Sequence, residues 1–323
     1  MVATTLVGSF PLEYSESNIR RALEDQAELG VTFPVLPQLR DFVYMYVEPM
    51  IRGRVVVQEG PGFRLKGDVE EVEPEPPEDI LVATDIAREL GVRFRVPITG
   101  AFTIASKIAL AGGRVGDMST SLLTDASARE GAVAYVKRMA RKLHREVRGD
   151  VYCVDEPVLS VIVGSRSVMY GITPEEISSA LDSVLAELGG MYRGVHVCGK
   201  LPPLLKGILL KLQNANFLDH EHSDFPANRI YYTREELASS NKKLAYGIVS
   251  PIKPSVEHEE EVLALARDAV DRYGGTLLFF KPDCGFGGLR GFLKGREYEE
   301  IVLKKIRVLV SVAEKVDYGA VKT

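Results

Sequence analysis

The sequence contains no tryptophan and only three cysteines among its 323 residues. So few cysteines, and an odd number of them, do not form the disulfide framework of a small secreted protein; they favour a reducing compartment where thiols stay free for metal binding or catalysis. The N-terminus lacks a positively charged leader followed by an apolar segment, so we expect no signal peptide. No apolar run approaches the ~20 residues of a membrane-spanning helix. We therefore expect a cytoplasmic protein without a membrane partner.

An excess of charge of either sign is also missing. The 40 lysines and arginines nearly balance the 45 aspartates and glutamates, which leaves a formal net charge of −5. This mild acidity provides no basic surface for nucleic acid, so we expect no nucleic-acid partner. An apolar content of 46% excludes a disordered chain. Because no Gly/Ser-rich linker or internal repeat divides the sequence, we expect residues 1–323 to form a single domain.

What the sequence does contain is a regular alternation of strand-like and helix-like segments. We expect eight strands, at Thr4–Gly8, Thr32–Leu36, Arg95–Thr99, Val151–Asp155, Gly194–Cys198, Ala215–Glu221, Leu244–Val249 and Thr276–Lys281. Each gap between them is long enough for a crossover helix, which predicts an α/β fold with a single (β/α)8 barrel of the TIM type. An open, doubly wound sheet is the alternative. Residues 55–66 predict a β-hairpin, which we interpret as an insertion after the second strand.

Candidate metal-binding residues follow three of the expected strands, at the end where a barrel places its active site. His196 and Cys198 close the fifth strand and, two residues apart, point to the same side of it. Cys284 follows the eighth strand, and the sixth ends in the polar segment 218–224. One histidine, two cysteines and a carboxylate from separate strands form a ligand set that suits zinc. The spacing alone leaves open which side chain of segment 218–224 binds the metal.

Four motifs resemble those of the catalytic domain of cobalamin-independent methionine synthase, in the same order and over nearly the whole chain. They are Thr4–Pro11, Thr99–Thr103, Asp155–Leu159 and Pro282–Gly285. The predicted hairpin also corresponds to one in that family. The resemblance implies a TIM-type barrel, zinc as cofactor, and transfer of a methyl group to the thiol of homocysteine to give methionine. Zinc suits this reaction because it deprotonates a bound thiol and leaves the sulfur nucleophilic.

The resemblance also assigns roles to individual residues. It implies zinc coordination by His196, Cys198, Glu221 and Cys284. Asp155 would bind the homocysteine ammonium group, and the backbone of Val7, Gly8 and Ser9 would receive the carboxylate, with Gly8 permitting close approach. Gln38 lies near the position of a family glutamate that assists the amino group; it can accept a hydrogen bond but brings no charge.

The departures from the family lie mostly on the methyl-donor side. Val249 stands where the family has a histidine proposed to protonate the departing folate nitrogen, and no tryptophan is present to stack on a pterin. The chain also has no room for the family's N-terminal duplicate domain. We therefore expect a methylated corrinoid on a partner protein, rather than a methylfolate or another pterin, as the donor, because a corrinoid leaves without a proton. If a folate is the donor, His222 is the candidate acid.

Two alternative functions fit part of the pattern. Corrinoid-dependent thiol methyltransferases that resemble uroporphyrinogen decarboxylase also carry His-x-Cys-Gly and a later zinc cysteine, and Gly199 fits them. The motifs at Gly8–Pro11 and Pro282–Gly285 favour the synthase family instead. A non-catalytic barrel with a structural zinc site is the second alternative, although structural ligands are more often clustered locally in the sequence.

Overall fold

Within residues 2–316, the part of the chain that the computed structural model describes, seven strands form one curled sheet in which every neighbouring pair is parallel. The sheet order is β1-β10-β9-β8-β7-β6-β4. The strands are β1 (Ala3–Thr4), β4 (Arg95–Thr99), β6 (Val151–Asp155), β7 (Tyr192–Val197), β8 (Phe217–His220), β9 (Lys243–Val249) and β10 (Leu277–Pro282). This is the α/β architecture predicted from the alternation, and the curled parallel sheet is consistent with a TIM-type barrel.

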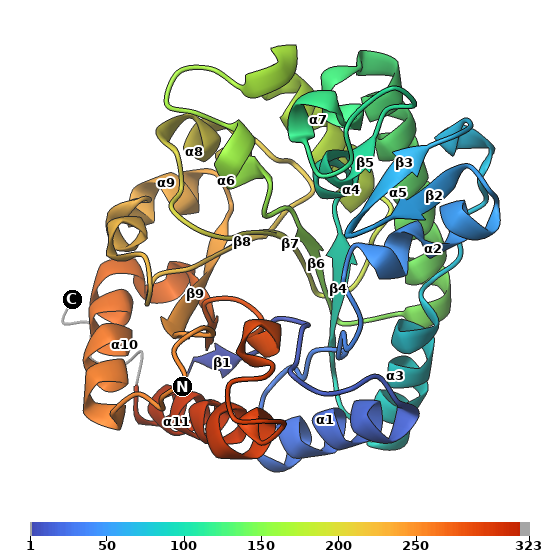
Figure 1. The fold of residues 1–323 in the computed structure, drawn as a ribbon. Coiled ribbons are helices and arrows are strands. Elements are labelled where there is room, and N and C mark those ends of the chain that lie inside the picture. The colour runs from blue at the N-terminus through green and yellow to red at the C-terminus, as the bar shows by residue number, and fades with distance from the viewer. Residues whose placement is uncertain (1, 317–323) are drawn as a thin grey trace.

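Helices cover the outside of this sheet, as Figure 1 shows. They are α1 (Glu16–Glu28), α2 (Tyr44–Arg52), α3 (Glu78–Glu89), α4 (Ala101–Lys107), α5 (Ala126–Val147), α6 (Leu159–Ile162), α7 (Pro174–Leu185), α8 (Pro203–Leu210), α9 (Arg234–Ser239), α10 (Glu259–Tyr273) and α11 (Leu303–Lys315). Local signals begin several of them; the Thr173 hydroxyl, for example, accepts a bond from the backbone N–H of Glu176. Among the residues described, no helix combines the length and apolarity needed to cross a membrane.

The first two predicted strands differ most from expectation. The strand expected at Thr4–Gly8 ends early, because the chain beyond Thr5 turns to pair with Gln38, whose N–H donates to the carbonyl of Gly8 at 2.7 Å. The strand expected at 32–36 is present only as single backbone bridges. Phe33 N–H donates to Thr4 on one side, and Leu36 N–H donates to Arg95 on the other. This segment therefore lies between the two edges of the seven-stranded sheet.

A small second sheet lies in the region where the sequence predicts a hairpin. Its strands β2 (Val56–Glu59) and β3 (Gly62–Leu65) pair antiparallel, and β3 also pairs in parallel with β5 (Ile108–Ala109). Gly60 lies in the turn with a φ of 59°, a backbone conformation that glycine adopts readily. Strand β5 was not predicted, because a strand of two residues has no readable periodicity.

Side chains inside the curled sheet form an apolar layer below the carboxyl ends of the strands, which we call the floor. An apolar cluster separate from the main core contains Phe33, Val151, Cys153, Phe217, Ala245, Leu278 and Phe279. The rings of Phe33 and Phe217 meet Phe279 edge to face, with centroids 5.5 and 5.7 Å apart. Alternate residues of a strand share a face. The residues two positions after Cys153, Phe217 and Phe279 therefore point to the same side, one layer nearer the carboxyl ends of the strands. These later residues include Asp155, Asp219 and Lys281.

A substitution at Gly194 on β7 tests how tightly this floor is packed. A Cβ added there would lie 2.6 Å from three ring atoms of Phe217, so the ring occupies the space of a side chain. We expect Gly194→Ala to lower the free energy of unfolding by about 1–3 kcal/mol, because the packed ring cannot withdraw freely. Chemical denaturation measures this change.

The matched control is Gly207→Ala in α8, where a Cβ would meet no atom within 4 Å. An alanine in a helix should raise the free energy of unfolding by about 0.5–1 kcal/mol. Equal midpoints and slopes for Gly194→Ala and the wild type would contradict the packing described.

Candidate metal centre

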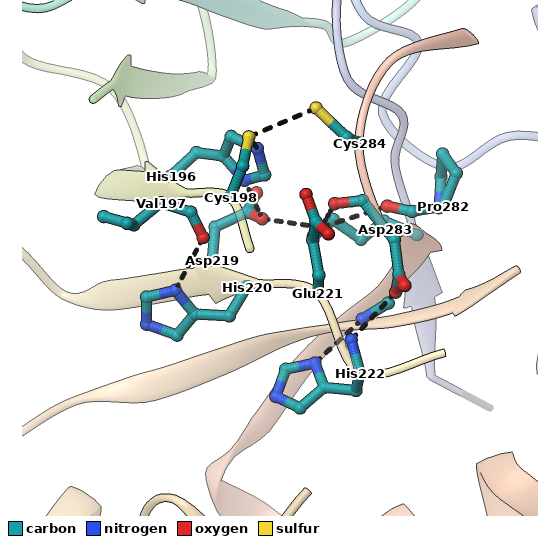
Figure 2. A network of polar contacts seen from close by, with 12 residues as sticks. His196, Val197, Cys198, Asp219, His220, Glu221, His222, Pro282, Asp283 and Cys284 are labelled. Carbon is teal, nitrogen blue, oxygen red and sulfur yellow. Dashed lines mark hydrogen bonds and ion pairs between the residues drawn. The ribbon is translucent and has the colours of Figure 1, made fainter. Parts of the chain in front are cut away.

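Three side chains with metal-binding atoms meet where β7 and β10 end (Figure 2). His196 lies on β7, Cys198 follows that strand directly, and Cys284 follows β10. Their ligand atoms lie within 4.8 Å of one another. Nε2 of His196 is 3.0 Å from Sγ of Cys198, which is 3.3 Å from Sγ of Cys284. The structure thus brings together three of the four residues proposed to bind zinc, and their donor atoms are those that zinc prefers.

Glu221, the fourth proposed ligand, lies just after β8. Figure 2 shows its carboxylate directed toward the cysteines, whereas the rings of His220 and His222 point the other way. This arrangement follows from the alternation of side chains along extended backbone. Burial, and then the proximity of Cys284, raise the pKa of Glu221. Between the histidines and Glu221, which the sequence spacing could not separate, the geometry favours Glu221.

The two thiols have different electrostatic surroundings. The contact with Cys198 and the neighbouring His196 ring lower the pKa of Cys284, whereas its neighbour Cys284 and burial raise the pKa of Cys198. Burial acts to lower the pKa of His196, but Asp219 outweighs it and raises that pKa to about 10. The surroundings therefore favour a thiolate at Cys284, and the thiolate is the form of cysteine that binds a metal.

Asp155 ends β6 and lies beside His196 in the sheet register. Its side chain is only 5% exposed, and Oδ1 has no hydrogen-bond partner among the described residues. Burial raises the pKa of Asp155 to about 6, although the positive charges of His196 and Arg95 act against it. A buried carboxylate oxygen without a partner is unfavourable, and a cationic group of a ligand would satisfy it.

The loop Val7–Ser9 packs against the loop that carries Cys284. The carbonyl of Ser9 accepts a bond from Phe286 N–H at 2.8 Å, and a Cβ on Gly285 would lie 2.1 Å from Ser9 Oγ. Gly8 faces Gln38 in the same way, since a Cβ there would lie 2.3 Å from Gln38 Oε1. Gln38 is buried, and its Nε2 has no partner among the residues described. The structure therefore brings the predicted carboxylate-binding loop and Gln38 alongside the metal-binding loop.

His222 is not brought to the cysteines. Its ring stacks on Tyr246, with centroids 3.7 Å apart, and its Nδ1 accepts a bond from the N–H of Gly247 at 3.3 Å. Burial, and then the nearby His220, lower the pKa of His222 well below its usual range, so the ring is neutral. The residue that the sequence offered as a substitute acid thus lies on the opposite side of its segment from the sulfur atoms.

A buried carboxylate that the sequence argument did not assign holds the loop after β8. Oδ1 of Asp283 accepts bonds from the backbone N–H groups of His222 and Ser223, and Oδ2 accepts one from Asp224, at 2.9, 3.0 and 2.6 Å. The motif that supplies Cys284 therefore also fixes the loop that follows Glu221. A Cβ on Gly247 would lie 1.9 Å from Asp283 Oδ1, so this contact requires glycine on β9.

Three further charged residues were not singled out from the sequence. Arg95, Asp219 and Lys281 lie beneath the cysteines and are fully buried. Oδ1 of Asp219 is 2.8 Å from Lys281 Nζ, and Oδ2 is 2.8 Å from Arg95 Nη1. A signal for them existed, because each is a charged residue within an otherwise largely apolar strand. The period of two places Asp219 and Lys281 on the inner face.

Known proteins are similar to this chain in sequence pattern and in fold. Residues 63–315 match the model of the family described as cobalamin-independent synthase, catalytic domain. The fold resembles that of a B12-independent methionine synthase from Shewanella sp. W3-18-1 in complex with selenomethionine, at 14% identity over 98% of this chain and 97% of that chain, with a TM-score of 0.67. A putative vitamin-B12 independent methionine synthase from Listeria monocytogenes gives 15% identity, 98% of each chain and a TM-score of 0.65.

The fold is shared more widely, since D-psicose 3-epimerase from Clostridium cellulolyticum H10 with D-tagatose gives a TM-score of 0.50 at 11% identity, over 97% of this chain and 99% of that chain. Identities this low show similarity of fold alone. No curated protein matches the chain.

We expect the protein to bind one zinc ion per chain at this centre. Cys198→Ser and Cys284→Ser should each abolish tight zinc binding, because a hydroxyl is a poor zinc ligand at neutral pH. Cys153→Ala removes a buried free thiol of β6 and is the matched control, which should retain the zinc content of the wild type. Metal analysis after dialysis measures the content. Stoichiometric zinc in both serine variants would refute the assignment.

Proposed function

This chain belongs to the family of the cobalamin-independent synthase catalytic domain, and on that premise we propose that it methylates the thiol of homocysteine to give methionine, with zinc as cofactor. Enzymes of this family are methyltransferases. The observation that carries the proposal is the meeting of His196, Cys198 and Cys284 beside Asp155, whose Oδ1 has no hydrogen-bond partner among the described residues. The histidine and the two cysteines suit a metal that activates a thiol. The Asp155 carboxylate suits an ammonium group on the same small molecule.

In this proposal residues 1–323 form one domain, since β1 and β10, from opposite ends of the chain, pair with each other. Segment 33–36 serves as the eighth strand and closes the barrel between β1 and β4. The β2–β3 hairpin is then an insertion after the second strand. The carboxyl ends of the strands meet at one face, which is why residues far apart in the sequence share a single site.

The metal would be held by His196, Cys198, Glu221 and Cys284. When bound there, zinc supplies the charge that keeps the acceptor thiol deprotonated at neutral pH. Asp155 orients the acceptor by accepting bonds from its ammonium group. Gln38, expected from the resemblance to assist the amino group, would instead donate to the acceptor carboxylate beside Val7–Ser9. Its Nε2 is a buried donor without a partner among the described residues, which supports this role.

Asp155→Asn tests how the acceptor is recognised. The substitution keeps the shape of the side chain but removes its charge, so homocysteine should bind more weakly while zinc content stays unchanged. Loss of a charge-assisted hydrogen bond costs roughly 1.5–3 kcal/mol, or about tenfold to a hundredfold in affinity. Steady-state kinetics over a range of homocysteine concentrations gives the apparent affinity.

A thiol without an amino group, such as 3-mercaptopropionate, is the matched substrate control. The Asp155→Asn change should not weaken its use. An unchanged apparent affinity for homocysteine, or a wild-type preference for the thiol without an amino group, would favour the alternative of a thiol methyltransferase with another acceptor. Zinc binding without methyl transfer to any thiol would favour the non-catalytic barrel.

The methyl donor needs a separate argument. The family and both methionine synthases of similar fold are named as cobalamin- or B12-independent, so they lend no support to the corrinoid donor expected from the sequence. Val249 is fully buried and has no proton to give, and His222 points away from the sulfur atoms. Neither residue is positioned to protonate a departing nitrogen.

A pocket next to the loop that follows β6 bears on the size of the donor. It has a volume of about 380 Å³ and lies between the hairpin and the loop that follows Asp155 and Glu156. Its largely apolar lining includes Phe42, Phe63, Pro157, Val158 and Val161. Such a volume suits a small planar heterocycle better than a corrin ring. We therefore propose a methylated reduced pterin of the folate type as the donor, and a methylated corrinoid protein as the alternative.

Side-by-side assays with methyltetrahydrofolate and methylcobalamin distinguish these donors. We expect methionine to form faster with methyltetrahydrofolate, because the pocket accommodates its ring. His222→Ala should retain this activity, since His222 is stacked on Tyr246 away from the cysteines. Loss of a general acid would instead lower the rate by about 10²–10⁴-fold. Faster turnover with methylcobalamin would overturn the pterin assignment, and a collapse in His222→Ala would restore His222 as the acid.

A further inference from the structure

We propose that Asp219 is a positioning residue that fixes the His196 ring for metal binding, and that Arg95 and Lys281 in turn fix Asp219. The inference rests on the proposed function, because it concerns the same metal centre. It assigns a role to three buried charges that the reaction itself does not use. None of the three is among the residues proposed to touch the metal or the substrates.

The contact between Asp219 and His196 determines which ring nitrogen is free. The two residues are direct neighbours in the register of β7 and β8. Nδ1 of His196 donates to Oδ1 of Asp219 at 2.7 Å, while Nε2 faces Cys198 Sγ at 3.0 Å. A neutral imidazole that carries its proton on Nδ1 has its lone pair on Nε2, so the carboxylate selects the tautomer that can bind a metal. Histidine ligands of metals commonly donate their other N–H to a carboxylate in this way.

Two buried cations hold Asp219 in turn. Lys281 Nζ lies 2.8 Å from Oδ1, and Arg95 Nη1 lies 2.8 Å from Oδ2. Lys281 Nζ also donates to the carbonyls of Pro282 and Asp283, at 3.0 and 2.7 Å. Because Cys284 follows directly, the same lysine connects the carboxylate behind His196 to the loop that carries a sulfur ligand. The network therefore joins β4, β7, β8 and β10.

Stability alone does not account for this network. Buried ion pairs are often no more stabilising than apolar side chains of the same volume. The layer directly below is in fact apolar, with Phe217 and Phe279 two residues before Asp219 and Lys281 on the same strands. The three residues of the network are two cations and one anion, so the network itself carries a net positive charge below thiolate and carboxylate ligands. That sign favours the anionic ligands above it.

The test compares Asp219→Asn with Glu156→Gln. Both replace a fully buried carboxylate by an amide, but the Glu156 carboxylate accepts bonds only from Phe102 and Thr103 at the start of α4. Glu156 contacts His196 only through its backbone N–H, which the substitution leaves in place. Asp219→Asn should lower zinc affinity by about 10–100-fold, as measured by competition with a chromophoric chelator. It should also shift the visible absorption of the cobalt(II)-substituted protein. Glu156→Gln should change neither property.

Wild-type zinc affinity and an unchanged cobalt spectrum in Asp219→Asn would overturn the inference while leaving the proposed function intact. A wild-type protein that binds no zinc would overturn both. Because loss of a buried charge can prevent folding, a measurement on the wild type is also needed. Nitrogen-15 NMR of the histidine-labelled, zinc-loaded protein should show the His196 proton on Nδ1. A proton on Nε2 instead would contradict the positioning role.

Discussion

The carboxylate of Asp219 accepts a hydrogen bond from His196 and lies 2.8 Å from both Lys281 and Arg95, so one side chain connects four strands in the buried interior of the curled sheet. Charges in such surroundings persist only when they are paired, which leaves each partner little freedom to move. The bond to Asp219 therefore also holds the His196 ring in place, and Lys281 holds the loop that bears Cys284 by donating to its backbone carbonyls. We therefore infer that the placement of the proposed metal-binding atoms depends on charged residues that touch neither of the proposed substrates.

Much of the fold and part of the site follow from the sequence because they depend on local patterns. The bounds of β4 and β6 agree with the strands predicted at Arg95–Thr99 and Val151–Asp155, and the family resemblance is confirmed by the match over residues 63–315. The strand expected at Thr4–Gly8 was wrong in length, because pairing with Gln38 depends on a distant segment. The contacts among Arg95, Asp219 and Lys281 were not predicted for the same reason. These residues are far apart in the sequence and meet only when the sheet curls.

The two halves of the proposed reaction differ in how the fold supports them. Acceptor groups such as Asp155 and His196 lie at the ends of hydrogen-bonded strands, where register fixes their relative positions. The proposed donor pocket is lined instead by residues outside the seven-stranded sheet, in the hairpin, α4, α6 and the loops around them. The thiol side retains the family pattern in this chain, whereas Val249 and the absence of tryptophan depart from it on the donor side.

The central claim is that the metal centre binds homocysteine as its thiolate, and proton release on binding tests it most directly. Isothermal titration calorimetry of the zinc-loaded protein, in buffers of different ionisation enthalpy, counts the protons released. An unperturbed thiol is mostly protonated at pH 7, so the account predicts release of about one proton per homocysteine bound. Methionine, which has no thiol, should bind without releasing one. Tight binding of homocysteine with no proton release would contradict the claim.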